Sequence, residues 1–345
     1  MFTVVILIYH FNANYKLGYC SNGDIAVEFF FVVTGYLLAS HVSRIQEGSK
    51  SWSWSEIADS TWMFINRKIR SFLRYYICAF SLKIIVRIVL IQRHSIPFVL
   101  KNLFKSIPTV TLTFMGLNNS SVALYVGNTW YLSAMLIAIF VLYPMLLKSF
   151  DFSTKIIFPL LSMFILDYLY ETYDTVSTWN QWTGICQTGV LRAIAEIALG
   201  AFLFQVSIVL ANKYRMRGEN TVEVILLTLF KISCYLVFLF YAYGISFGKS
   251  FTIHALLFCS VGVTMSFSGI GYTLPDCRLT RYLGRISLPI FIFRGFIRWT
   301  IKDFMVARGG IAVSFVQFLV IICIAIILSM AFMHITDYVA DKLKV

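Results

Sequence analysis

Long apolar runs alternate with short polar segments along almost the whole chain. A helix needs roughly 20 mostly apolar residues to cross the hydrocarbon core of a bilayer, within a range of about 17–25. Nine runs approach or reach this length, and a shorter apolar run precedes them. The pattern therefore predicts ten membrane helices, at residues 1–11, 25–42, 71–91, 130–147, 156–169, 191–211, 222–242, 251–267, 286–301 and 313–333.

The segments between these runs contain no sign of a second domain. The segment after the second run is polar, carries Trp52, Trp54 and Trp62, and is predicted to be a loop. Residues 98–117 are intermediate in polarity, which indicates an interfacial or re-entrant piece. No strand-like alternation is visible, so backbone groups in lipid must be paired within helices. We predict a single all-α polytopic membrane domain over residues 1–345, a bundle of about ten transmembrane helices.

The first run ends at Phe11 and is too short to span a bilayer without help. Either the helix is tilted and capped by the polar residues 12–16, or the natural chain begins upstream of Met1. We expect the second arrangement.

Composition agrees with a membrane protein, since 59% of the residues are hydrophobic and only 13% are charged. Soluble domains average about 25% charged residues. The formal net charge of +13 fits basic residues in cytoplasmic loops better than a nucleic-acid partner, for which the sequence holds no motif. With the N-terminus inside, 16 lysines and arginines fall on the cytoplasmic side and 9 outside. We predict a multi-pass protein of the cell inner or plasma membrane with both termini in the cytoplasm.

Seven cysteines are spread along the chain without any CxxC pair, and at least three lie in apolar runs. Buried thiols behave as small hydrophobic groups. Histidines and cysteines also lack the spacing of a metal site. We predict neither a disulfide nor a bound metal.

A carboxylate, Glu28, stands near the start of the second apolar run. Ionisable groups inside membrane segments are costly and usually functional, so Glu28 needs a partner. The expected partner is His10, close to the end of the first run, or an arginine of the third helix. A histidine can serve as a general base, and a carboxylate can orient its ring. Tyr9 and His10 would equally fit an interfacial aromatic belt.

Three arginines mark the start of the third helix. Arg67, Arg70 and Arg74 are three and four residues apart, so a helix places them on one side. Such a stripe suits a polyanionic ligand, because a guanidinium grips a phosphate with two hydrogen bonds. The predicted topology places the stripe at the inner face and His10 toward the outer half of the membrane. The same arginines would also anchor a span by the positive-inside rule, and the residues alone leave both interpretations open.

Five segments, taken in order, resemble those of a known family. They are residues 7–11 (LIYHF), 26–37 (AVEFFFVVTGYL), 64–70 (FINRKIR), 129–134 (TWYLSA) and 283–291 (LGRISLPIF). They are similar, in turn, to an apolar run ending in histidine, V-[DE]-x-F-F-x-x-S-G-[FY], R-x-x-R, W-x-L-S and L-G-x-I-S-x-x-I-[YF]. The chain therefore resembles the integral-membrane acyltransferase-3 family, whose members include O-acetyltransferases of surface polysaccharides.

The resemblance implies a membrane O-acyltransferase. It would move an acyl group, expected to be acetyl, from cytoplasmic acyl-CoA (acetyl-CoA) to a hydroxyl of a cell-surface or lipid-linked glycan. The donor's phosphates would bind Arg67 and Arg70, with Arg74 beside them. His10 would deprotonate the acceptor hydroxyl or carry the acyl group transiently, and Glu28 would position His10. The candidate acceptor-binding residues are Trp130, Ser133 and Arg294.

The chain departs from the family pattern at two informative places. Thr34 stands where serine is commoner, which is a mild change. The late segment usually continues to a histidine after the aromatic residue, whereas here Phe293 is followed by Arg294. We favour a structural ion pair between Arg294 and Glu196 of the sixth helix. An acceptor pocket that grips an acidic sugar is the other interpretation.

A transporter or flippase for a glycan-related or anionic solute is the alternative function. Four ionisable residues would then form a proton or substrate path: His10, Glu28, Glu196 and Arg294. Transporters of this kind show inverted repeats or paired helices broken by glycine or proline, and the sequence shows neither. An inactive member of the family is a third interpretation.

Overall fold

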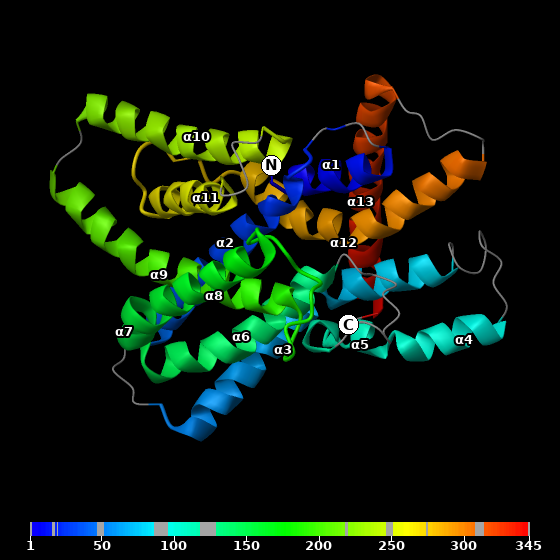
Figure 1. Cartoon of the computed structure of the whole chain (residues 1–345), viewed down its shortest axis with the longest axis horizontal. Coiled ribbons are helices and arrows are strands. Elements are labelled where there is room, and N and C mark those ends of the chain that lie inside the picture. The colour runs from blue at the N-terminus through cyan, green and yellow to red at the C-terminus, as the bar shows by residue number, and fades with distance from the viewer. Residues whose placement is uncertain are drawn as a thin grey trace. The chain divides into compact units, whose positions relative to one another are not determined.

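The computed structural model describes residues 2–15, 18, 20–46, 52–85, 96–117, 129–217, 220–245, 251–273, 275–307 and 314–343. Within these residues the regular structure is helical, apart from one isolated bridge between Trp182 and Gln187. The helices (Figure 1) are α1 (Phe2–Tyr15), α2 (Ala26–Gln46), α3 (Trp54–Leu82), α4 (Ile96–Lys105), α5 (Ile107–Val110), α6 (Trp130–Lys148), α7 (Phe150–Phe152), α8 (Phe158–Tyr173), α9 (Thr188–Arg217), α10 (Thr221–Tyr243), α11 (Phe251–Phe267), α12 (Arg278–Ala307) and α13 (Phe315–Leu343).

The all-α polytopic membrane fold predicted from the sequence is confirmed. Each of the ten predicted segments overlaps a helix, and residues 1, 86–91 and 313 of these segments lie outside the described residues. Among the described residues, six helical stretches are long and apolar enough to cross a membrane. They are Gly23–Gln46, Trp130–Lys148, Phe150–Tyr173, Thr188–Tyr214, Thr221–Tyr243 and Phe315–Lys342. Two shorter apolar helices, Phe2–Asn12 and Phe251–Phe267, accompany them.

The prediction of a loop around the three tryptophans is wrong for two of them, because α3 already begins at Trp54. A reciprocal cap starts this helix. The Glu56 backbone N–H donates to the Ser53 hydroxyl at 3.3 Å, and the Glu56 carboxylate accepts from the Ser53 backbone N–H at 3.0 Å. This is the S-x-x-E capping box. Trp54 and Trp62 are 69% and 62% exposed, as suits aromatic side chains at a membrane interface.

Contacts divide the chain into two compact units. Unit 1 comprises Met1–Ser21, Asn66–Ser133 and Asp276–Val345, and unit 2 comprises Asn22–Ile65 and Ala134–Pro275. Helices α3 and α6 each contribute residues to both units.

Unit 2 is organised around the pair α2 and α9, its most extensive helix contact. Gly35 on α2 faces the backbone of Ile197, and Gly200 on α9 faces the backbone of Val32. Small residues let helix backbones approach closely in membranes, where dispersion packing replaces the hydrophobic effect between helices. These two glycines therefore set the separation of α2 and α9.

Replacing Gly35 by alanine is expected to destabilise the protein by about 1–3 kcal/mol. The added Cβ would overlap the Ile197 carbonyl oxygen, which is rigid backbone. Thermal unfolding of the purified protein in detergent measures the loss. Gly284→Ala is the matched control, since a Cβ there meets nothing within 4 Å and alanine favours helix. Equal stability of Gly35→Ala and the wild type would show that α2 and α9 are not in backbone contact.

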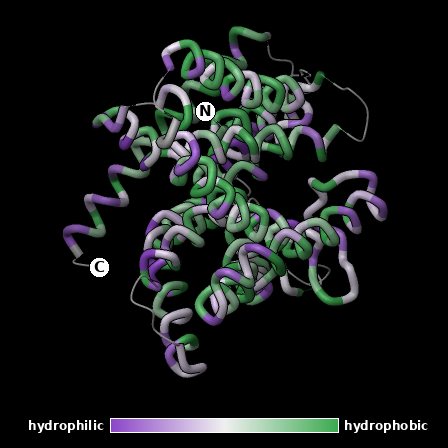
Figure 2. The backbone as a smooth tube through the Cα atoms, turned by 90° about the vertical axis from the view of Figure 1, so that its left-hand side faces the viewer, coloured by the Kyte–Doolittle hydropathy of each residue, from purple (hydrophilic) through white to green (hydrophobic). Residues whose placement is uncertain are grey.

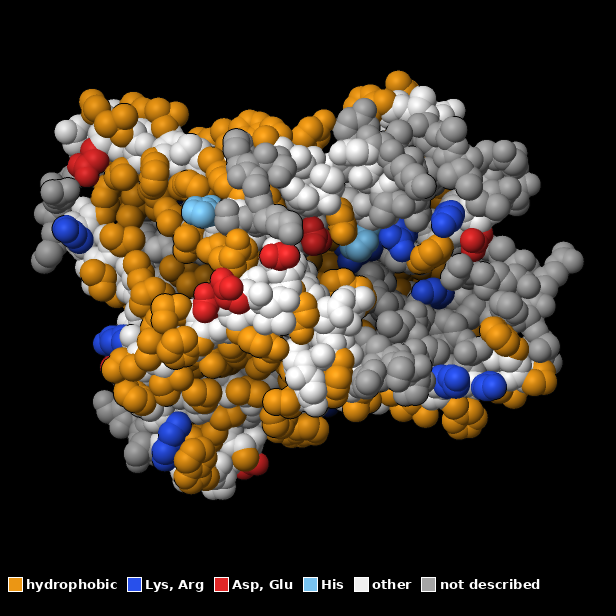
Figure 3. Space-filling view, in the orientation of Figure 1, with side chains coloured by type: hydrophobic (Ala, Val, Ile, Leu, Met, Phe, Trp, Pro, Cys, Tyr) orange, Lys and Arg blue, Asp and Glu red, His pale blue; other side chains and the backbone are white. Residues whose placement is uncertain are grey.

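The rest of unit 2 presents apolar surface outward. Helix α8 packs on α9, and α10 packs on α11. Only 22% of the most apolar stretch of α10 is buried within the protein. Hydrophobic side chains cover much of the visible face of α8, α9 and α10 (Figure 3). Apolar residues also run along most of the helices (Figure 2). An apolar surface this large fits contact with lipid tails rather than water.

Unit 1 joins α1, α12 and α13. Asp337 on α13 ties three side chains together: it accepts a hydrogen bond from the Tyr75 hydroxyl at 2.7 Å and pairs with Arg285 at 2.6 Å and Arg74 at 3.3 Å. This cluster fixes the second half of α3 against α12 and α13. At the start of α12, hydrogen bonds from the Thr280 backbone N–H and hydroxyl lower the pKa of the Cys277 thiol.

Candidate functional site

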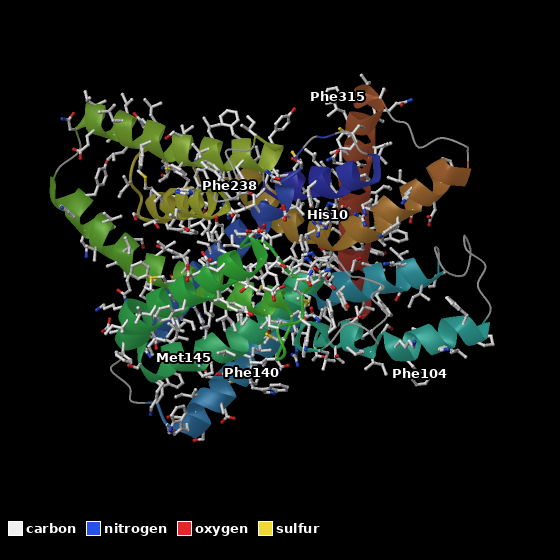
Figure 4. All side chains as sticks on the ribbon, viewed as in Figure 1. His10, Phe104, Phe140, Met145, Phe238 and Phe315 are labelled. Atoms are coloured by element: carbon white, nitrogen blue, oxygen red, sulfur yellow. The ribbon has the colours of Figure 1, made fainter. Side chains whose placement is uncertain are left out.

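His10 lies in the second half of α1, which packs against α12 (Figure 4). Arg298 of α12 donates from Nη1 to the His10 carbonyl oxygen at 3.1 Å, and the same nitrogen lies 3.5 Å from the ring Nδ1. The Tyr9 ring meets the imidazole edge-on, with the ring centroids 5.0 Å apart. His10 as a residue is half-buried, and these contacts hold it in place.

Arg294 lies one helical turn before Arg298, on the same side of α12. Its side chain is 2% exposed, and its guanidinium sits over the Phe291 ring at 4.3 Å from the centroid. Both guanidiniums act electrostatically on the His10 imidazole. The structure thus brings together two residues predicted from the sequence, His10 and Arg294.

Arg298 is a site residue that the sequence interpretation missed, because it was counted only among the basic residues of the outer side. A signal was present, because Arg294 and Arg298 are four residues apart and a helix stacks such positions on one face. Helix α12 continues to Ala307, beyond the predicted end at residue 301, and both arginines lie within the predicted segment and within the helix.

The arginine stripe lies on α3 as expected, within unit 1. The side chains of Arg67 and Arg70 are exposed. Arg74 is 39% exposed and is tied to Asp337. Two members of the stripe are therefore accessible to a polyanion, while the third is held by the Asp337 cluster.

Trp130 and Ser133 open α6 and are both buried. The Ser133 hydroxyl donates to the Leu112 carbonyl at 2.6 Å and accepts from the Met115 backbone N–H at 3.3 Å. Its hydrogen bonds thus hold the chain before α6 and leave little for a substrate. Tyr131, which lies between Trp130 and Ser133 in the sequence, contacts Phe291 edge-on, with the ring centroids 5.5 Å apart. This contact joins the start of α6 to the part of α12 that carries Arg294.

Glu28 lies fully buried in unit 2, where its partner is Arg192 of α9. The prediction that Glu28 pairs with His10 or with an arginine of the third helix is therefore wrong. Arg192 is also fully buried, donates from Nη1 to the Ser177 carbonyl at 2.7 Å, and lies 3.5 Å from Glu196 through Nε. One guanidinium thus serves two carboxylates and fixes the loop before α9 to α2.

The predicted ion pair between Arg294 and Glu196 is also wrong. Glu196 pairs with Arg192, four residues earlier on the same helix. The i, i+4 spacing of opposite charges is a recognised helical pairing, and it could have indicated this partner from the sequence. Arg294 has no ion pair within the part of the chain that the structure describes.

No group of three or more histidine, cysteine, aspartate or glutamate side chains able to hold a metal ion occurs among the described residues. No curated protein and no solved structure matches the chain. A family model described as an acyltransferase domain matches residues 2–334, almost the full length and residues of both units. With its apolar helices and this match, the chain belongs to the acyltransferase-3 family and is a membrane acyltransferase.

Proposed function

We propose that this protein transfers an acetyl group from acetyl-CoA to a hydroxyl of a cell-surface or lipid-linked glycan. The observation that carries the proposal is His10: a half-buried residue on α1 whose carbonyl oxygen accepts a hydrogen bond from Arg298 of α12, in a chain whose residues 2–334 match an acyltransferase family. The excess of lysine and arginine in the inner loops supports a plasma-membrane protein with cytoplasmic termini. The donor would then arrive from the cytoplasm.

The donor's phosphates would bind the exposed arginines Arg67 and Arg70. These side chains are accessible, carry fixed positive charge, and offer paired N–H groups that match phosphate oxygens. Arg74 and Arg285 add charge to the same region while staying attached to Asp337. The uncharged pantetheine arm would carry the thioester from there toward His10.

In the chemical step, His10 would act as the general base. A neutral imidazole nitrogen would take the proton of the acceptor hydroxyl while the oxygen attacks the thioester carbonyl. The C–S bond then breaks, and the imidazolium returns the proton to the departing CoA thiolate. Arg298 is bound to the His10 carbonyl oxygen at 3.1 Å, and this bond holds the residue through either ring tautomer.

Acceptor binding is proposed for Trp130 and Arg294, on the two segments joined by the contact of Tyr131 with Phe291. Aromatic faces suit sugar rings, and a guanidinium suits polar substituents. Positioning of His10 by Glu28 stays a prediction, and the partnership with Arg192 gives Glu28 a structural role besides.

The direct test uses the full-length protein in lipid nanodiscs with [¹⁴C]acetyl-CoA. Membranes of the source organism, prepared after deletion of this gene, supply the acceptors. We expect protein-dependent label in a glycan fraction, released by mild base as expected of an O-acetyl ester. Movement of an intact solute across the bilayer, with no label transferred from acetyl-CoA, would favour the transporter alternative and defeat the enzyme proposal.

Replacing Arg70 by alanine is expected to raise the KM for acetyl-CoA about tenfold and change kcat little. One charge-assisted phosphate contact is worth roughly 1.5 kcal/mol, and tenfold corresponds to 1.4 kcal/mol. Arg44→Ala is the control, since Arg44 is exposed and its Nε donates to the Ser40 carbonyl of its own helix. Equal effects of the two substitutions would argue against a phosphate site on α3.

A further inference from the structure

Arg294 is a buried cation that has no counterion among the described residues. Its side chain is 2% exposed, and its Nε and Nη1 atoms find no hydrogen-bond acceptor among the described residues. The contact that it does make is with the π face of Phe291. Unlike a lysine, arginine cannot escape this situation by losing its proton. Burial of a charge without a paired anion is costly.

A second cation increases that cost. Arg298 stands one turn further along the same face of α12, and both guanidiniums act on His10. Their Nη groups cannot neutralise each other. Two carboxylates of unit 1 pair with other cations: Asp276 with Arg281, and Asp337 with Arg285 and Arg74.

We propose that Arg294 and Arg298 form an anion-binding subsite beside His10, and that the acceptor carries a carboxylate or phosphate group near the hydroxyl that is acylated. This proposal rests on the proposed function and adds the class of acceptor. Paired guanidiniums hold a carboxylate or phosphate through charge-assisted bonds in a fixed orientation. An anion seated there would compensate the buried charge and place a neighbouring hydroxyl at the imidazole.

The same chemistry could in principle be supplied by the donor, whose phosphates are also anions. The exposed Arg67 and Arg70 already provide a site for those phosphates. The pantetheine arm, which brings the thioester to His10, carries no charge. The subsite is therefore assigned to the acceptor, and the experiment separates the two sources.

The test measures binding to the full-length protein in nanodiscs, by the rise in apparent Tm that a ligand of the folded state produces. The probes are sodium glucuronate, glucose and coenzyme A, at constant ionic strength set with sodium chloride. We expect glucuronate to bind and glucose not to. Arg294→Met is expected to weaken glucuronate binding about 10–100-fold, as for loss of a charge-assisted contact of roughly 1.5–3 kcal/mol, while coenzyme A still binds.

Two further variants make the result specific. Arg70→Ala should show the reverse pattern, with weaker coenzyme A binding and unchanged glucuronate binding. Arg281→Gln is the matched control on α12, because Arg281 is exposed and paired with Asp276. It should bind glucuronate as the wild type does. Arg294→Lys, which retains the positive charge but loses the paired N–H donors of the guanidinium, should bind glucuronate with intermediate affinity.

Stability gives a readout that a structural arginine would not give. Without ligand, Arg294→Met should raise the apparent Tm by roughly 2–5 °C, because an unpaired buried charge is replaced by an apolar side chain of similar length. A structural role predicts the opposite sign. Lower stability of Arg294→Met together with unchanged glucuronate binding would overturn the proposal.

The outcome is separable from that of the proposed function. If acetyl transfer occurs but glucuronate binds no better than glucose, the anionic acceptor is wrong and the enzyme stands. If Arg294 governs glucuronate binding but no acetyl group is transferred, the subsite stands and the enzyme proposal fails. Loss of coenzyme A binding, rather than glucuronate binding, in Arg294→Met would assign the subsite to the donor and overturn the proposal.

Discussion

Replacing His10 by alanine is expected to reduce acetyl transfer by about 10²–10⁴-fold, the usual contribution of a general base. The fold should survive, because Arg298 binds His10 mainly through the backbone carbonyl at 3.1 Å, and this bond needs no side chain. The contact between α1 and α12 therefore persists while the proton acceptor is lost. Turnover of [¹⁴C]acetyl-CoA with its acceptor measures the effect, and the apparent Tm checks the fold.

His254→Ala is the matched control for this substitution. His254 belongs to α11 in unit 2 and stacks on Phe251 with centroids 5.8 Å apart, and it has no part in the proposed chemistry. It should keep full activity. A His10→Ala enzyme within threefold of the wild-type rate would exclude His10 as the base. Label that stays on the wild-type protein and is absent from His10→Ala would instead identify an acyl-carrying histidine.

The helices could be predicted because a membrane imposes one rule on the whole sequence. Apolar length marks each span, and unpaired backbone in lipid excludes loops within it. The rule failed where a helix leaves the hydrocarbon: α3 begins at Trp54 in a polar stretch. There the informative signal was the short-range box of Ser53 and Glu56, which hydropathy does not detect.

The candidate site could be predicted in its residues more than in its partners. His10 and Arg294 stand out as polar residues in apolar surroundings, whatever the fold. The pairing of Glu28 with Arg192, by contrast, joins positions 164 residues apart. Such a contact depends on how α2 crosses α9, which is set by backbone approach at Gly35 and Gly200. The spacing of residues along one sequence does not show where α2 and α9 cross, so it could not predict this pair.

Each unit contains a buried arginine, and the two arginines differ in the partners that surround them. In unit 2, Arg192 is surrounded by acceptors: two carboxylates and the carbonyl oxygens of Ser177 and Asp24. In unit 1, Arg294 faces an aromatic ring and pairs with no acid in the described part of the chain. A buried charge whose partners are supplied by the protein contributes to structure, while one whose partners are missing has its cost offset by a ligand. The same substitution is therefore expected to have opposite effects on stability in the two places.

Arg192→Met is expected to destabilise the protein by about 3–5 kcal/mol, the usual cost of removing one partner from a buried ion pair. Glu28 and Glu196 are both fully buried, and without the guanidinium they would confront each other with no cation between them. The loop anchor at Ser177 would be lost as well. Thermal unfolding in detergent measures the change, together with the yield of folded protein on size exclusion.

Glu28→Gln provides the control, because it removes one negative charge and leaves Arg192 paired with the single carboxylate of Glu196. Arg192 would still pair with Glu196, and the amide oxygen would still accept its hydrogen bond, so the expected loss is only about 1 kcal/mol. The asymmetry between the two substitutions is the diagnostic result, since it follows from one guanidinium shared by two acids. Equal losses would mean that Glu196 does not share the charge of Arg192. Loss of acetyl transfer in a stable Glu28→Gln protein would support a role for Glu28 in positioning His10.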